Sequence, residues 1–353
     1  MPIQYAEFWI DACQGDGTAG WRREAQNTMP ITNLTDNARD GLRVLQLENE
    51  WHSLSILPEV GAKILTLFDK KNARNVLWEN PRIRPQRFPI DANFDNYWCG
   101  GWDDAFPTAD ACVHQGDSFP NNGELRSLNW QVEDLSADDY GAVARLSAYG
   151  AISAIKATKT VSLIGRVTHL HFEIESLSPL PLDFLWGTHP AFAVETGTRL
   201  IVPARVGIVG QSSHPSLGSP GEQYDWPLLK SEYGVTDMSI VPDIAAGIAC
   251  GHYATGLEDG WFAVETGGTG ILYEFPLETC PHLWLWLDNG GWRGYQNAIV
   301  EPWTGYPVNL EQAVKNGRSS QLLPGMKFAV TVRCTTYAAP ETHADALLRL
   351  RKE

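Results

Sequence analysis

The sequence predicts an all-β protein, a large antiparallel β-sandwich with few short helices. Three observations support this class. Apolar and polar residues alternate with period two in many short segments from about residue 50 onward. Turn-forming residues separate these segments, and a content of 32 Gly and 22 Pro suits turns better than helices. Helical patterning is confined to short stretches near the C-terminal end.

The expected strands follow one another along the chain with short turns between them, which is typical of stacked antiparallel sheets. In one of them, Leu170, Phe172 and Ile174 face one side, whereas His169 and His171 face the other. The expected strands with the clearest pattern are residues 53–57, 63–69, 142–148, 158–164, 169–175, 282–287 and 328–334.

One short helix is expected after Asn309, which can cap the first N–H groups, with Gln312 completing a capping box and Gly317 ending the helix. Residues 341–351 also have a helical pattern. Because no linker or repeat interrupts the chain, we expect one domain over residues 1–353. Its expected parts are a weakly patterned N-terminal segment (1–45), the sandwich (46–337) and a helical C-terminal tail (338–353).

Composition excludes several classes of protein. A net charge of −15 disfavours nucleic acid and anionic lipid as partners. We see no apolar run of the ~18 residues that a membrane span needs and no signal peptide. The six Cys are scattered and indicate reduced thiols, so we expect a cytoplasmic protein. His169 and His171 share a strand face, but without a third convincing ligand we expect no metal site.

Two segments, residues 82–126 and 284–307, interrupt the strand pattern with aromatic and polar residues. A long irregular segment in a compact domain is usually functional or disordered, and aromatic residues at this density make disorder implausible. Aromatic rings cover the C–H face of a pyranose, while Asp, Asn, Glu and Arg bond its hydroxyls. The composition of both segments therefore favours a sugar site.

Four motifs in this order resemble the galactose mutarotase-like superfamily, over roughly residues 50–337. They are residues 54–79, GGWDDAFPT (100–108) followed by NNGELR (121–126), GTHPAF (187–192) and IVEPWTGYP (299–307). The resemblance implies a β-supersandwich with its site on the concave face of one sheet. It also implies chemistry without a cofactor on a monosaccharide substrate.

Two catalytic residues are carried over from this resemblance. His189 matches the family's general acid and Glu301 its general base. Interconversion of α and β anomers needs a proton removed from the C1 hydroxyl and one delivered to the ring oxygen, which such a pair can do without metal, nucleotide or covalent intermediate. Taken alone, His189 is also typical of a hydrogen-bonded turn histidine.

The expected substrate-binding residues are Arg87, Trp102, Asp103, Asn122, Glu124 and Trp303. Asn122 stands where the family usually has a histidine that contacts the sugar, which predicts a changed substrate. Arg87 lies in a loop with two further arginines that can grip a carboxylate, phosphate or sulfonate. Each residue also has a structural interpretation: Trp102 and Asp103 as loop scaffold, Glu124 as a buttress, Trp303 as core, and the arginines as a solvated loop.

The sequence thus predicts an isomerase similar to aldose 1-epimerases, acting on a modified or anionic sugar. One alternative is a non-catalytic carbohydrate-binding protein. Another is a glycoside hydrolase or lyase, which would pair Glu301 with Asp103 or Glu124. The sequence specifies neither the sugar nor the oligomeric state.

Overall fold

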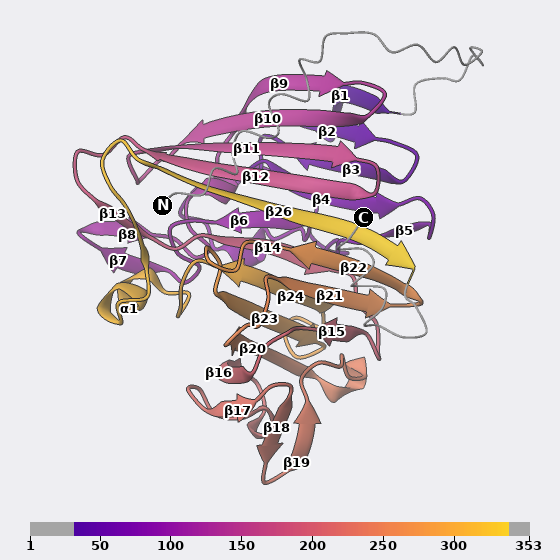
Figure 1. Ribbon diagram of the computed structural model, residues 1–353, viewed down its shortest axis with the longest axis vertical. Coiled ribbons are helices and arrows are strands. Elements are labelled where there is room, and N and C mark those ends of the chain that lie inside the picture. The colour runs from indigo at the N-terminus through magenta and orange to yellow at the C-terminus, as the bar shows by residue number, and fades with distance from the viewer. Residues whose placement is uncertain (1–31, 339–353) are drawn as a thin grey trace. The chain divides into compact units, whose positions relative to one another are not determined.

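A computed structural model describes residues 32–338, and these residues form two large antiparallel sheets that pack face to face (Figure 1). Three two-stranded ladders and one short α-helix accompany the sheets within this range. The predicted all-β class with few short helices is therefore confirmed.

The larger sheet has 12 strands. Its order is β1 (Asn33–Arg39), β2 (Leu42–Glu48), β3 (His52–Leu57), β4 (Lys63–Asp69), β6 (Trp102–Ala105), β14 (Gly187–Phe192), β24 (Gln296–Trp303), β23 (His282–Asn289), β20 (Ile248–Thr255), β16 (Val206–Ser212) and β17 (Gln223–Asp225), with β5 (Arg74–Asn75) paired to β4.

The smaller sheet has 8 strands, in the order β15 (Arg199–Ile201), β21 (Trp261–Thr266), β22 (Thr269–Glu274), β26 (Lys327–Ala338), β12 (Val167–Ser176), β11 (Ile155–Ile164), β10 (Gly141–Tyr149) and β9 (Gln131–Ala137). The two-stranded ladders are β7 (Cys112–His114) with β8 (Asp117–Phe119), β13 (Leu182–Phe184) with β25 (Ser320–Leu322), and β18 (Leu228–Ser231) with β19 (Gly234–Asp237).

The main core fills the space between the two sheets. The apolar face predicted for β12, with Leu170, Phe172 and Ile174, is fully buried there. Phe172 meets Trp186 with ring centroids 5.5 Å apart. Apolar burial of this kind is the main favourable term in folding, so the alternating pattern that marks each strand also decides which face turns inward.

The short helix is also confirmed, as α1 (Leu310–Lys315). The side chain of Asn309 accepts a hydrogen bond from the backbone N–H of Gln312 at 3.1 Å, as the capping pattern predicted. The larger sheet begins before residue 46, where the sandwich was expected to start, because β1 lies wholly before that residue and β2 spans it. β1 is an edge strand exposed along most of its length, so it carries no alternating pattern.

Residues 1–31 and 339–353 lie outside the described residues, and with them most of the predicted helical tail. Residue 338 belongs to β26. Between residues 32 and 338, no helix is long and apolar enough to cross a membrane. The five cysteines of this range form no disulfide.

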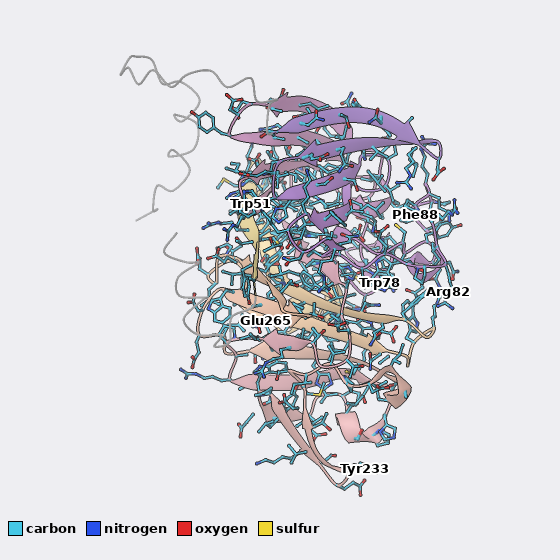
Figure 2. The ribbon with its side chains drawn as sticks, turned by 90° about the vertical axis from the view of Figure 1, so that its right-hand side faces the viewer. Trp51, Trp78, Arg82, Phe88, Tyr233 and Glu265 are labelled. Carbon is cyan, nitrogen blue, oxygen red and sulfur yellow. The ribbon has the colours of Figure 1, made fainter. Side chains whose placement is uncertain are left out.

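The irregular segment after β5 lies on the outer face of the larger sheet. Figure 2 places Trp78, Arg82 and Phe88 on that side, away from Glu265 of the smaller sheet. Beneath this segment run β6, β14, β24 and β23, which are neighbours in the middle of the larger sheet. The two segments that sequence analysis singled out thus border the same sheet face.

Candidate active site

Three ionisable side chains fall in one row across β6, β14 and β24. The pairing of β14 with β6 sets His189 opposite Asp103. The pairing of β14 with β24 sets Gly187 opposite Trp303, so His189, two residues later, falls opposite Glu301. Directly opposite residues on an antiparallel pair share one sheet face, which explains how positions far apart in sequence meet.

The same row continues into two aromatic residues. Glu301 lies opposite Trp284 of β23, and Trp284 lies opposite Tyr253 of β20. Tyr253 and Trp284 have ring centroids 4.4 Å apart. We call this set the site row; its members, in strand order, are Asp103, His189, Glu301, Trp284 and Tyr253.

The centre of the site row is the pair of His189 and Glu301. Nε2 of the imidazole lies 4.0 Å from Oε1 of the carboxyl group, and only 9% and 3% of the two side chains are exposed. The rings of Trp98 and Phe94 stand edge-on to the imidazole, at centroid distances of 6.0 and 6.3 Å. The sequence-predicted catalytic pair is therefore brought together inside aromatic walls.

Burial shifts the pKa values of both groups toward their neutral forms. It lowers the pKa of His189 to about 4, and nearby Asp103 only partly opposes the shift. Burial also raises the pKa of Glu301 well above its usual value, against a hydrogen bond from Trp303. The pair therefore favours a neutral imidazole beside a protonated carboxyl group, which is not the charge state that reference pKa values predict.

Trp303, two residues after Glu301 on the same face of β24, holds the carboxyl group of Glu301. Its Nε1 donates a hydrogen bond to Oε2 of Glu301 at 3.2 Å, and its side chain is almost completely buried. The indole lies against Gly187, where an added Cβ would come within 2.2 Å of the ring. The glycine of the GTHPAF motif is thus required for this packing, and Trp303 positions the carboxyl group.

Asp103 is held by a lysine that sequence analysis missed. Nζ of Lys63 lies 2.5 Å from Oδ2 of Asp103 and donates to the carbonyl oxygen of Gly100 at 2.7 Å. Both side chains of this ion pair are 4% exposed. Oδ1 of Asp103 is buried and has no hydrogen-bond partner in the part of the chain that is described.

A small, narrow pocket lies beside His189. Its lining includes Phe94, Asp103, Asn122, Arg126 and His189. Asn122, predicted to bind substrate, is therefore at the pocket, and its backbone adopts a positive φ of 59° in the turn before Gly123. Arg126 was missed, although it ends the NNGELR motif that contains Asn122.

Two of the predicted substrate-binding residues, Trp102 and Glu124, do not line the pocket. Trp102 neighbours Asp103 on β6 and so points into the sandwich, where its Nε1 donates to Oγ1 of Thr188 at 2.5 Å. Glu124 is fully buried and accepts hydrogen bonds from the backbone N–H groups of Ile152 at 2.7 Å and Ser153 at 3.1 Å. Both have the structural roles that were the alternatives to substrate contact.

Arg87 is also separate from the pocket. Its guanidinium pairs with the carboxylate of Glu59, and its side chain is 59% exposed. It also lies 3.4 Å from the carbonyl oxygen of Gly41. This exposed position agrees with the alternative interpretation of the arginines as part of a solvated loop. The prediction that this loop binds an anionic group is therefore not supported at Arg87.

An arginine joins the two irregular segments over the aromatic wall. Nη1 of Arg293 donates to the carbonyl oxygen of Asp95 at 2.6 Å, and Nη2 donates to Oδ1 of Asn96 at 3.1 Å. Next to this contact, Trp98 and Trp292 have ring centroids 6.1 Å apart. The two segments predicted to form a site therefore pack against each other beside His189.

Metal-ligating residues do not cluster in residues 32–338, where no group of three or more His, Cys, Asp or Glu could hold an ion. His169 and His171 lie on the outward face of β12. Nδ1 of His171 lies 2.8 Å from Oγ1 of Thr331, so this side chain has a hydrogen-bonding role within the sheet.

No protein-family model matches the sequence, and no curated protein matches it. The structure is, however, similar to several solved structures. A galactose mutarotase-like protein from Clostridium acetobutylicum is 15% identical with a TM-score of 0.64, covering 87% of this chain and 99% of that one. A candidate aldose 1-epimerase from Klebsiella pneumoniae is 14% identical with a TM-score of 0.69, covering 88% and 84%. The Slr1438 protein from Synechocystis is 17% identical with a TM-score of 0.61, covering 90% and 100%. These likenesses show that the chain has the galactose mutarotase-like fold.

Proposed function

We propose that this chain is a sugar mutarotase, an isomerase of the aldose 1-epimerase type that interconverts the α and β anomers of a monosaccharide. The observation that carries the proposal is the buried pair of His189 and Glu301, with Nε2 and Oε1 4.0 Å apart in the middle of the site row. The fold shared with a galactose mutarotase-like protein supports the same class of reaction.

The pair has the protonation that ring opening needs. Opening a hemiacetal removes a proton from O1 and delivers one to O5, so the two catalytic groups must together hold a single proton. At 4.0 Å the two side chains are too far apart to bond each other directly, and each can reach one of the two oxygens on the anomeric carbon. After rotation about C1–C2, the reverse transfers close the ring on the other face.

The acid and base roles follow from which group holds the proton. Sequence analysis assigns Glu301 as the base at O1 and His189 as the acid at O5. With the pKa of His189 lowered to about 4 by burial, the neutral imidazole is the better acceptor at the start of the cycle. Because opening and closing are the reverse of each other, each side chain serves as acid in one step and as base in the other.

The remaining site residues bind or position in this proposal. Asn122 and Asp103 line the pocket and offer groups for sugar hydroxyls. Trp303 holds the carboxyl group of Glu301. Proton transfer between side chains needs no cofactor, and the sparse, scattered cysteines are the basis for placing the activity in the cytoplasm.

A glycoside hydrolase is the weaker candidate. Such an enzyme needs two carboxyl groups free to flank the glycosidic bond. Asp103 is paired with Lys63, and Glu124 accepts backbone hydrogen bonds, so neither is a free partner for Glu301. A carbohydrate-binding protein without turnover would keep the pocket, and it is distinguished from a mutarotase by rate alone.

The test adds single anomers of neutral and anionic aldoses and follows the approach to anomeric equilibrium by NMR. We expect acceleration over the spontaneous rate for at least one sugar, a loss of ~10²–10⁴-fold in His189→Ala, and no loss in the control His171→Ala on the outer sheet face. Absence of acceleration for every sugar contradicts the proposal. Release of new reducing ends from glycosides would favour the hydrolase instead.

A further inference from the structure

Arg126 carries a buried positive charge that faces the pocket without a bonded carboxylate. The residue is 3% exposed, and its Nη1 is buried with no hydrogen-bond partner in residues 32–338. The guanidinium carbon lies 3.6 Å from the ring centroid of Phe94, so the cation is fixed on an aromatic face. Burial lowers the pKa of Arg126 to about 9, which leaves it charged at neutral pH.

The charges around Arg126 do not cancel it. Asp103 is already paired with Lys63, at 2.5 Å. Asp104 is paired with Lys159, inside the sandwich. Asp95, the other carboxylate that acts on the pKa of Arg126, forms no hydrogen bond or ion pair with it, so within residues 32–338 the guanidinium has no bonded counter-charge.

Such a charge is unfavourable unless something complements it. A buried ion without a bonded partner loses its hydration, and the loss is repaid only by close opposite charge and hydrogen bonds. A neutral hydroxyl can accept from Nη1 but leaves the charge unbalanced. An anionic group both accepts from the planar guanidinium fork and balances its charge, and such bonds are roughly twice as strong as neutral ones.

We infer that Arg126 binds an anionic substituent of the sugar, a carboxylate, phosphate or sulfonate, so that the substrate class of this site is an anionic monosaccharide. The inference rests on the proposed function. Arg126 and His189 line the same pocket. The anion is held at Arg126 and Asn122 while the anomeric carbon meets His189 and Glu301.

Binding of inorganic phosphate and of sulfate tests the anion site without catalysis. Calorimetry on the full chain is expected to show binding to wild type and to Arg87→Gln, and at least 10-fold weaker binding to Arg126→Gln. Arg126→Lys keeps the charge without the fork and is expected to be intermediate. Removing an unbalanced buried charge should leave the melting temperature of Arg126→Gln at or above the wild-type value, which shows that the variant folds.

Anomer exchange tests the substrate class. Glucose 6-phosphate, glucuronate and 6-deoxy-6-sulfoglucose are each compared with glucose, which separates phosphate, carboxylate and sulfonate recognition. We expect at least one anionic sugar to exceed glucose in kcat/KM, and Arg126→Gln to reduce that preference by about 10- to 100-fold, mostly through KM.

The outcomes of the two measurements separate the inference from the proposed function. Equal rates for glucose and the anionic sugars, with phosphate binding unchanged in Arg126→Gln, overturn the inference and leave the mutarotase standing. Loss of phosphate binding in Arg87→Gln but not in Arg126→Gln also overturns it. If no sugar is exchanged yet phosphate binding depends on Arg126, the mutarotase is rejected and the anion site is supported.

Discussion

Two histidine–glutamate pairs in this protein have the same separation but different surroundings. On the outer face of β12, Nε2 of His171 lies 4.0 Å from Oε2 of Glu173. On the outer face of the larger sheet, Nε2 of His189 lies 4.0 Å from Oε1 of Glu301. The first two side chains are 41% and 25% exposed, and the second two are 9% and 3% exposed.

The difference shows that residue type and distance do not by themselves make a proton-transfer site. Around His171 and Glu173, which are partly exposed, water screens the charges; burial lowers the pKa of His171 too, but Glu173 opposes that shift. Around His189, the rings of Phe94 and Trp98 exclude water, so burial shifts the pKa and strengthens every electrostatic contact. The aromatic rings that exclude water around His189 and Glu301 therefore distinguish this candidate catalytic pair from the more exposed pair of His171 and Glu173.

The largest expected effect on the rate of anomer exchange comes from substituting His189 and Glu301, singly and together. We expect His189→Ala and Glu301→Gln each to slow anomer exchange by ~10²–10⁴-fold, and the double variant to lose little more than the worse single variant, because the two groups transfer one proton as a unit. NMR exchange rates on the three variants give the comparison. Losses that multiply would mean that the two residues act independently.

The acid side of the pH–rate profile of the wild-type protein tests whether His189 is shielded from water, unlike an exposed histidine. Burial lowers the pKa of His189 to about 4, so kcat/KM for a neutral aldose should hold down to that pH and fall below it, where the pair gains a second proton. A histidine with the unperturbed pKa of about 6.5 would instead lose about 30-fold by pH 5. A limb near 6.5 would place His189 in the same class of environment as an exposed histidine.

Trp303→Phe removes the hydrogen bond to Glu301, which has no counterpart in the pair of His171 and Glu173. The bond from Nε1 at 3.2 Å favours the charged form of Glu301, so its removal raises the pKa of that carboxyl group further. We expect about a 10-fold lower kcat at neutral pH and an alkaline limb moved to higher pH. Trp284→Phe, which changes another indole of the site row without this bond, is the control; equal profiles for the two variants would contradict the role of Trp303.

The smallest expected effect is on stability. Burial raises the pKa of Glu301 above its ordinary value of 4.5, so its contribution to stability is complete below pH 4.5 and is lost as pH rises through the folded-state pKa. Glu301→Gln should therefore gain stability over wild type with rising pH, by up to about 1.4 kcal/mol per pH unit. Urea unfolding at several pH values measures the gain. Glu173→Gln, on the smaller sheet, should show no such gain in stability with rising pH. A parallel gain in both variants would contradict the effect of burial.

Local patterns were enough to predict the strands and the short helix. Alternation identified the apolar face of β12, and the capping pattern identified α1, because both depend on neighbours within a few residues. His189 and Glu301 were found by motif resemblance. Their separation of 4.0 Å depends on which strands pair and in what register, information that lies in no local segment.

The errors have the same cause. Trp102 was expected at the substrate, but the direction of a side chain on β6 depends on the pleat and on the neighbouring strand. Among several arginines, only burial and hydrogen bonding distinguish Arg126 from the exposed Arg87. Lys63 stood in an ordinary strand, and nothing in its neighbours predicts an ion pair with Asp103.

The most direct test of the account compares the two glutamates. Anomer exchange of one accepted sugar is measured by NMR at neutral pH in wild type, Glu301→Gln and Glu173→Gln. If burial makes the catalytic pair, Glu301→Gln loses ~10²–10⁴-fold and Glu173→Gln matches wild type. Full activity in Glu301→Gln, or an equal loss in both variants, would contradict the claim that the buried pair carries the reaction.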